Sequence, residues 1–212
     1  MPFIVFEGLD GSGKSSLMSA LEAELREKNI SCLRTREPGG TDLGDEIREM
    51  ILRPEGPSPT PRTELLLYEA SRSQHVDQVI RPHLQKNYWI LCDRFTASSL
   101  AFQAGGRSIS EEWVEQLNRF ATDGILPDLT VLLDLSVEES RKRRNRRESA
   151  NGSKQDRIES EADSFHERVR NSFLSQAAQD PDRWLVLDAS QTPEQLIEKL
   201  RAHLRSLGWQ GY

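Results

Sequence analysis

The chain has 212 residues, of which 36% are hydrophobic and 29% charged, and its formal net charge at pH 7 is −6. This size and composition predict one globular domain, and the negative charge argues against a protein that binds nucleic acid through its phosphates. No apolar run approaches the ~18 residues of a membrane span, and Cys32 and Cys92 provide neither a disulfide framework nor a metal-binding spacing. Because an apolar strand pattern follows the first methionine directly, we expect no signal peptide, no membrane partner and a cytoplasmic location.

Five strand-like apolar runs alternate with helical stretches along the chain. The expected strands cover residues 3–7, 31–35, 89–93, 129–134 and 184–188. The expected helices cover residues 14–28, 42–52, 62–85, 110–123, 138–147, 158–178 and 193–207. This alternation predicts an α/β fold with a parallel five-stranded sheet flanked by helices on both faces.

A complete P-loop motif, GLDGSGKS, stands between the first expected strand and the first expected helix. Its glycines Gly8, Gly11 and Gly13 let the backbone turn and direct its N–H groups toward phosphate oxygens. Lys14 adds a positive charge for the β- and γ-phosphates, and the Ser15 hydroxyl is suited to hold Mg²⁺. The helix that follows directs the positive end of its dipole at the same anion. The motif therefore predicts a nucleoside triphosphate ligand.

The loop after the second expected strand reads TREPGGT over residues 35–41. It presents Arg36 and Glu37 at the carboxyl edge of the sheet, where open α/β folds bind their ligands. An ordinary loop with a charged tip explains these residues equally well, so the loop alone decides nothing.

The third expected strand ends in Asp93 and Arg94. A carboxylate at this place, beside the P-loop strand, is typical of a Walker-B-type Mg²⁺ ligand. Asp134 ends the fourth expected strand and is the rival candidate. We favour Asp93, because the neighbouring Arg94 would point into the crevice where a phosphoryl group is transferred.

A basic run, RKRRNRR, covers residues 141–147, and the polar segment ESANGSKQ follows it over residues 148–155. In a P-loop kinase this combination predicts a mobile lid, at about residues 143–157, whose arginines close over the γ-phosphate. A solvated helix face or a nucleic-acid patch is the alternative for the basic run.

The chain resembles bacterial thymidylate kinases over most of its length, through segments that occur in this order: FEGLDGSGKS, TREPGGT, LGDEIR, LLLYEASR, CDRFTASSLAFQAGGR, PDLTVLLDL, DRIE and VLDAS. The resemblance implies a three-layer P-loop kinase fold, a single domain over residues 1–212 and a homodimer. It further implies that ATP and Mg²⁺ are used to phosphorylate dTMP to dTDP in dTTP synthesis, with another pyrimidine nucleoside monophosphate kinase as the alternative. A GTPase switch would need an N-K-x-D segment, which the sequence lacks.

The resemblance also implies roles for residues on the ATP side of the site. Lys14, Arg94 and Arg147 would be catalytic, and Ser15 and Asp93 would hold the metal ion. The residues expected to bind ATP are Gly8, Asp10, Gly11, Ser12, Gly13, Lys14, Ser15, Ser16 and Arg143. Some members carry an arginine inside the P-loop, whereas this chain has Gly11 there and an arginine-rich lid. It is therefore similar to the type in which the lid supplies the arginine.

On the dTMP side, Tyr68 would stack on the thymine ring, Arg72 would contact the thymine edge, and Pro38 would lie near the 5-methyl group. Arg48 would bind the acceptor phosphate, and Arg94 would lie between the donor and acceptor phosphates. The remaining expected contacts are Asp10 near the sugar, Ser99 and Gln103 at the pyrimidine, and Phe102 where a ribose 2′-hydroxyl would project.

Three residues depart from the family pattern. Phe102 replaces a tyrosine, Ala104 replaces a glycine, and Glu69 stands where a small residue is usual beside the stacking aromatic ring. Glu69 puts the finer specificity of the pocket in question.

Overall fold

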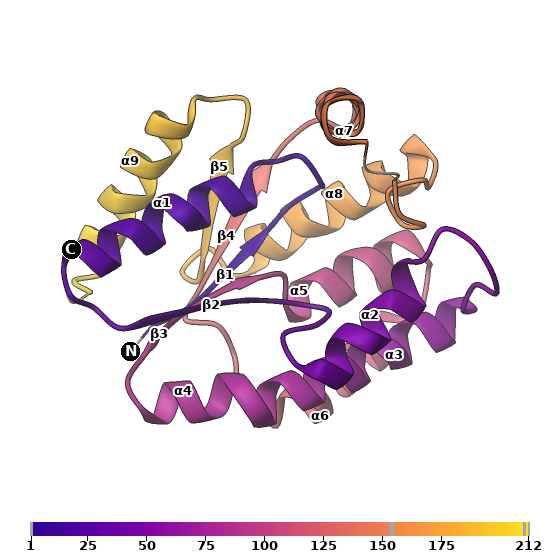
Figure 1. Cartoon of the computed structure of the whole chain (residues 1–212), viewed down its shortest axis with the longest axis horizontal. Helices are drawn as coiled ribbons and strands as arrows, with labels where there is room; N and C mark the ends of the chain where they lie inside the picture. Colours follow the sequence, from indigo (N-terminus) through magenta and orange to yellow (C-terminus); the bar gives the residue numbers. More distant parts are fainter. Residues whose placement is uncertain (1, 153–154, 210, 212) are drawn as a thin grey trace.

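The computed structural model describes residues 2–152, 155–209 and 211. Its strands form one parallel sheet in the order β2-β3-β1-β4-β5 (Figure 1). The strands are β1 (Phe3–Glu7), β2 (Cys32–Arg36), β3 (Trp89–Asp93), β4 (Leu129–Asp134) and β5 (Trp184–Asp188). The predicted α/β fold with a parallel five-stranded sheet is confirmed.

The central strand β1 is buried along its whole length. Ile4 and Phe6 face one core cluster, and Phe3 and Val5 face another on the opposite side of the sheet. Because helices cover both faces, Phe3 to Phe6 are all apolar and form one continuous hydrophobic run before Glu7. The P-loop follows this strand and so starts from the middle of the sheet.

The helical segments are α1 (Lys14–Glu27), α2 (Asp42–Leu52), α3 (Pro61–His75), η1 (Val76–Ile80), α4 (Arg81–Gln85), α5 (Thr96–Ser99), η2 (Leu100–Gly106), α6 (Glu111–Thr122), α7 (Val137–Asn151), α8 (Asp163–Gln179) and α9 (Pro193–Ser206). Helices α1 and α9 lie side by side on one face of the sheet (Figure 1). Segments α8, η1 and η2 contribute to the cores on the other face. The result is a helix–sheet–helix arrangement of three layers.

Two helix boundaries were predicted wrongly. We expected residues 148–155 to form a loop, but α7 continues to Asn151 and ends where Gly152 adopts a left-handed conformation with φ of 64°. We also expected a helix from residue 158, but α8 begins at Asp163. The carboxylate of Asp156 accepts the backbone N–H groups of Ile158 and Glu159 at 2.8 Å, and this cap gives the intervening residues a turn of their own.

The sequence did not predict the helical stretch formed by α5 and η2. Ala97, Ser98, Ala101, Phe102 and Ala104 of this stretch are all buried. A helix that is buried around most of its circumference has no polar face, so it shows no amphipathic period.

Within the described residues, no helix combines the length and the apolar character needed to cross a bilayer. The expected lid at residues 143–157 includes 153–154, which lie outside the described residues.

Candidate functional site

The P-loop is packed tightly against β4 and α7. Gly8 has φ of 132°, and a Cβ atom there would lie 2.4 Å from the carbonyl oxygen of Leu133. Gly11 has φ of 80°, and its Cβ would approach the Cβ of Arg143 to 3.1 Å. Both glycines are therefore required by backbone conformation and by space.

Lys14 closes this loop from the first turn of α1. Its Nζ donates hydrogen bonds to the carbonyl oxygens of Gly8 and Leu9, at 3.1 and 3.3 Å, and lies 4.0 Å from Asp93 Oδ1. Burial lowers the pKa of Lys14, and the nearby Arg94 lowers it further. The ammonium group is thus held under the loop by carbonyl oxygens, with carboxylates close by.

Asp93 has the features of a metal ligand. Its Oδ1 is buried and accepts no hydrogen bond within the described part of the chain. Both Asp93 and Ser15 line the groove beside the P-loop. The rival Asp134 is instead engaged by Arg170 in two hydrogen bonds of 2.6 and 2.8 Å. A carboxylate oxygen that accepts no hydrogen bond and a hydroxyl fit Mg²⁺, which prefers oxygen ligands.

The protein alone supplies few metal ligands here. Among the described residues, no group of three or more His, Cys, Asp or Glu side chains is arranged to hold a metal ion. Mg²⁺ commonly takes one or two carboxylates and completes its shell with water and substrate phosphates. The sparse ligand set is therefore compatible with an ion that arrives with a nucleotide.

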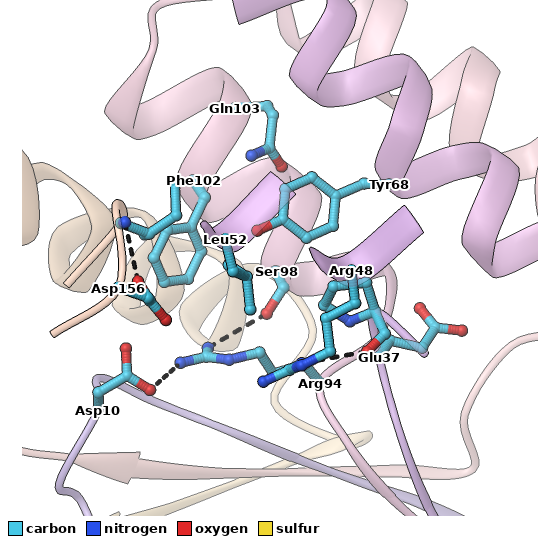
Figure 2. Close-up of a pocket in the computed structure, with 12 residues that line it drawn as sticks. Asp10, Glu37, Arg48, Leu52, Tyr68, Arg94, Ser98, Phe102, Gln103 and Asp156 are labelled. Carbon is cyan, nitrogen blue, oxygen red and sulfur yellow. Dashed lines mark hydrogen bonds and ion pairs between the residues drawn. The ribbon is translucent and has the colours of Figure 1, made fainter. Parts of the chain in front are cut away.

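Arg94 lies in the middle of the site, beside Asp10 and Ser98 (Figure 2). Its Nη2 donates to Asp10 Oδ1 at 2.9 Å, its Nη1 lies 3.4 Å from Ser98 Oγ, and its guanidinium sits 5.0 Å from the ring centre of Phe102. Burial disfavours ionisation of Asp10, but Arg94 and Lys14 outweigh it and hold the pKa of Asp10 below its usual range. The backbone of Arg94 has φ of 71°, a strained conformation of the kind that clusters at functional sites.

Two cavities meet at this arginine. A groove of about 620 Å³ runs along the P-loop, and a narrower pocket continues from it. Both are lined by Asp10, Glu37, Arg48, Arg94 and Asp156. The groove suits an extended polar ligand, and the narrower pocket, with aromatic walls, suits a flat one.

Most of the residues predicted for the acceptor line the pocket (Figure 2). They are Asp10, Pro38, Arg48, Tyr68, Arg94, Phe102 and Gln103. Tyr68 comes from α3 and Phe102 from η2, so two elements far apart in sequence provide the aromatic walls. Burial raises the pKa of the Tyr68 hydroxyl, which keeps this wall uncharged.

Arg72 and Ser99 were expected at the base, but neither lines the pocket. The Arg72 side chain is only 2% exposed and donates to Glu37, Glu69 and the carbonyl of Phe95. It also reaches Asn118 at 2.7 Å and Ser99 at 2.9 Å. The carboxylate of Glu69, the unusual residue beside Tyr68, is one of the groups that hold Arg72 behind the pocket wall.

Several lining residues were not predicted. Sequence reasoning did not assign Leu52, Ser98, Asp156 and Ile158 to the pocket. Glu37 lines it too, so the TREPGGT loop contributes to the site rather than serving as a plain connector. Asp156 and Ile158 belong to the DRIE segment, which was noticed only as part of the resemblance.

The basic run is divided between the groove and the core. Arg143 and Arg147, one helical turn apart on α7, line the groove. Arg143 Nη2 donates to the Ala189 carbonyl at 3.0 Å, and Arg147 pairs with Glu159. Arg144 is buried and donates to the Glu159 carbonyl at 2.6 Å. Arg143, expected from the sequence to bind ATP, and Arg147, expected to be catalytic, thus both line the groove.

The site offers positively charged groups to both cavities. Lys14 and Arg147 line the groove, whereas Arg48 and Arg94 line both the groove and the pocket. Such an arrangement can neutralise two phosphate groups brought end to end.

Comparison with known proteins gives a consistent picture. The sequence model of the family described as Thymidylate kinase matches residues 6–200. A thymidylate kinase of Bdellovibrio bacteriovorus is 70% identical over 200 residues, which cover 94% of each chain. Thymidylate kinases of Pelotomaculum thermopropionicum and Trichlorobacter lovleyi are 47% and 44% identical, over 92% and 93% of this chain and 88% and 94% of theirs.

Proposed function

The chain belongs to the thymidylate kinase family and phosphorylates dTMP to dTDP, and we propose that it does so with ATP and Mg²⁺ in the joined groove and pocket. The observation that carries this proposal is the position of Arg94, paired with Asp10, where the two cavities meet. The alternative, another pyrimidine nucleoside monophosphate kinase, is not favoured by these relatives.

We place ATP in the groove. The backbone of the P-loop would bind its phosphates, Lys14 would leave the carbonyl oxygens of Gly8 and Leu9 to follow the γ-phosphate, and Arg143 would line the nucleotide. Ser15 and Asp93 would hold Mg²⁺, which when bound neutralises charge on the phosphate oxygens.

The transfer needs positioning rather than a general base. A phosphate oxygen of dTMP, already ionised near neutral pH, attacks the γ-phosphorus of ATP. A new P–O bond forms, the bond between the γ-phosphorus and the bridging β–γ oxygen breaks, and ADP leaves. Lys14, Arg94 and Arg147 are the cations available to stabilise the transferring group.

We place dTMP in the pocket. Tyr68 would stack on the base, Phe102 would crowd the sugar on the side where a ribose hydroxyl projects, and Arg48 would take the phosphate. Pro38 and Gln103 complete the lining. Arg72 and Ser99 would support this site from behind, through Glu37, which lines it.

We further infer that the protein works in the cytoplasm, where its nucleotide substrates would be supplied.

We also infer that the protein is a homodimer. Large apolar side chains are exposed on three helices: Leu43 and Met50 on α2, Leu66 on α3, and Trp113 and Phe120 on α6. Helix α3 packs against both α2 and α6. The two pairs are each spaced by seven residues, so each pair lies on one face of its helix. Such an apolar surface fits a second copy of the chain.

A substrate panel tests the proposed function. Purified protein with ATP and Mg²⁺ is expected to form dTDP from dTMP far faster than it phosphorylates dCMP, dGMP or thymidine. In Lys14→Ala, kcat should fall by roughly 100- to 1000-fold, because a charge on the transferring group is lost, whereas the exposed Lys142→Ala serves as the matched control. Equal rates for dTMP and thymidine, or an active Lys14→Ala protein, would contradict the proposal.

A further inference from the structure

A buried carboxylate lies behind the amide of Gln103. Glu64, on α3, is 1% exposed. One of its oxygens accepts Gln103 Nε2 at 3.0 Å and Arg107 Nε at 3.1 Å. The other accepts Arg107 Nη2 at 3.2 Å and Arg157 Nη2 at 2.6 Å.

The groups around this carboxylate favour its ionised form. Burial alone would raise the pKa of Glu64, but hydrogen bonds from Arg107 and Gln103 and the charge of Arg107 lower it overall. An ionised carboxylate only accepts hydrogen bonds, so the group that faces it must be a donor.

The charge on Glu64 therefore decides which end of the Gln103 amide faces the pocket. The NH₂ group must face Glu64, and the carbonyl oxygen Oε1 is left for the other side. Within the part of the chain that the structure describes, the Gln103 side chain makes its hydrogen bond through Nε2 and not through Oε1. In Figure 2 the amide is directed toward the space between the rings of Tyr68 and Phe102.

We propose that Glu64 is a positioning residue that sets the base specificity of the acceptor pocket, by fixing Gln103 so that it presents a hydrogen-bond acceptor to the base. The inference rests on the proposed function, in which the base stacks on Tyr68.

The two pyrimidine bases differ in what they offer to this carbonyl oxygen. Thymine carries an imide N–H, a donor that matches the carbonyl oxygen. Cytosine carries an unprotonated nitrogen at the same ring position. Two hydrogen-bond acceptors, this nitrogen and Gln103 Oε1, would then face each other with no hydrogen between them. A buried unmatched acceptor pair is costly, so the pocket discriminates against dCMP.

Glu64→Gln is the first test. The amide introduced at position 64 can donate, so the Gln103 amide is free to rotate and present NH₂ to the base. The ratio of kcat/KM for dTMP over dCMP is expected to fall at least ~10-fold, chiefly through KM for dTMP. The ratio of dTMP over dUMP is expected to stay unchanged, because uracil carries the same imide N–H.

The double variant Glu64→Gln with Gln103→Glu, which exchanges the two side chains, provides a rescue. The amide at position 64 can then donate to the carboxylate at position 103, whose other oxygen again presents an acceptor to the base. The dTMP over dCMP ratio is expected to recover toward the wild-type value, which a general loss of structure cannot explain.

Arg107→Lys is the matched control. It changes a partner of the same carboxylate but keeps the positive charge beside it and leaves the contact between Glu64 and Gln103. Its dTMP over dCMP ratio should stay within ~3-fold of wild type. An unchanged ratio in Glu64→Gln, an equal fall in Arg107→Lys, or no recovery in the double variant would overturn the inference.

The wild-type protein offers a measurement that needs no variant. The Gln103 side-chain NH₂ should exchange its hydrogens slowly with and without dTMP, because it donates to Glu64 in both states. Rapid exchange would overturn the inference even if Glu64→Gln failed to fold. If the wild type did not phosphorylate dTMP at all, the proposed function would fail instead.

Discussion

At the scale of single residues, charged groups divide into those that face the cavities and those that hold the surrounding structure together. Arg94 and Arg72 are both close to the pocket that we propose binds dTMP, but only Arg94 lines it. Arg72 is surrounded by two carboxylates, two other side chains and one carbonyl. A guanidinium with this many buried acceptors is already satisfied and acts first as part of the structure.

We therefore expect Arg72→Ala to destabilise the fold. The change leaves Glu37 and Glu69 buried without their cation, which should cost about 3–5 kcal/mol in the free energy of unfolding. Chemical denaturation measures this loss. Arg81→Ala, which removes a surface pair with Asp123, is the control and should cost at most ~1 kcal/mol. Equal losses in the two variants would contradict the assignment.

A second residue-scale prediction concerns Glu7, at the end of β1. It is fully buried, and burial raises its pKa to about 7 from an ordinary 4.5, although Arg94 and hydrogen bonds from Ser98 and the Phe95 N–H oppose the shift. The folded protein therefore holds this proton more tightly than the unfolded chain. The stabilisation that results is complete below about pH 4.5 and is lost as the pH rises through about 7.

The Glu7→Gln variant has no carboxyl group to titrate at this position, so it does not lose this stabilisation as the pH rises. The free energy of unfolding of the variant, relative to that of the wild type, should therefore increase between about pH 5 and pH 8. Denaturation curves across this range measure the difference. Lys14 and Arg94 face Glu7 in the wild type, and their positive charges oppose the rise in its pKa. A difference that stays constant across this range would show that Glu7 does not titrate there.

At the scale of elements, α7 shows how one helix can serve both the core and the site. Its Arg144 anchors it to Glu159 and His166, while Arg143 and Arg147 reach the groove from the adjacent face. The helix is longer than expected, so these arginines are carried by a regular element. Whether the lid moves stays a prediction.

The lid prediction can be tested with the same helix. In Arg147→Ala, kcat should fall roughly 100-fold, since in the proposed mechanism the charge of Arg147 meets the phosphoryl group only in the transition state. KM for dTMP should change little. Arg146→Ala is the matched control, because Arg146 is exposed and does not line the groove. Steady-state kinetics measure both. A normal kcat in Arg147→Ala would remove this residue from the mechanism.

At the scale of the whole molecule, the main feature is the set of apolar side chains that α2, α3 and α6 leave exposed to solvent in a single copy of the chain. Phe120 is 84% exposed and Trp113 is 63% exposed. Apolar side chains that gather in an exposed patch mark surfaces for protein–protein contact.

Wild-type protein should therefore have twice the 24.2 kDa mass of one chain in solution. Phe120→Glu should shift it toward the monomer, because a charge is then buried at the interface. Leu207→Glu is the control, since Leu207 is exposed at the end of α9, outside this surface. Sedimentation measures the masses, and a monomeric wild type would contradict the dimer.

The sequence by itself determined the features that depend on local pattern. The five strands, the P-loop and most helix bounds could be read from it, because burial on both faces and glycine geometry leave local traces. The family and its reaction followed from long motifs in the correct order.

Only the tertiary structure decided where charged side chains point. Arg72 and Arg94 are alike in sequence terms, but the buried carboxylates of Glu37 and Glu69 engage one while the other faces the cavities. The same holds for Glu64, whose partners lie 39, 43 and 93 residues away along the chain. Burial turns such contacts into strong constraints, because an unpaired charge cannot be left there, and no local pattern in the sequence records which groups will meet.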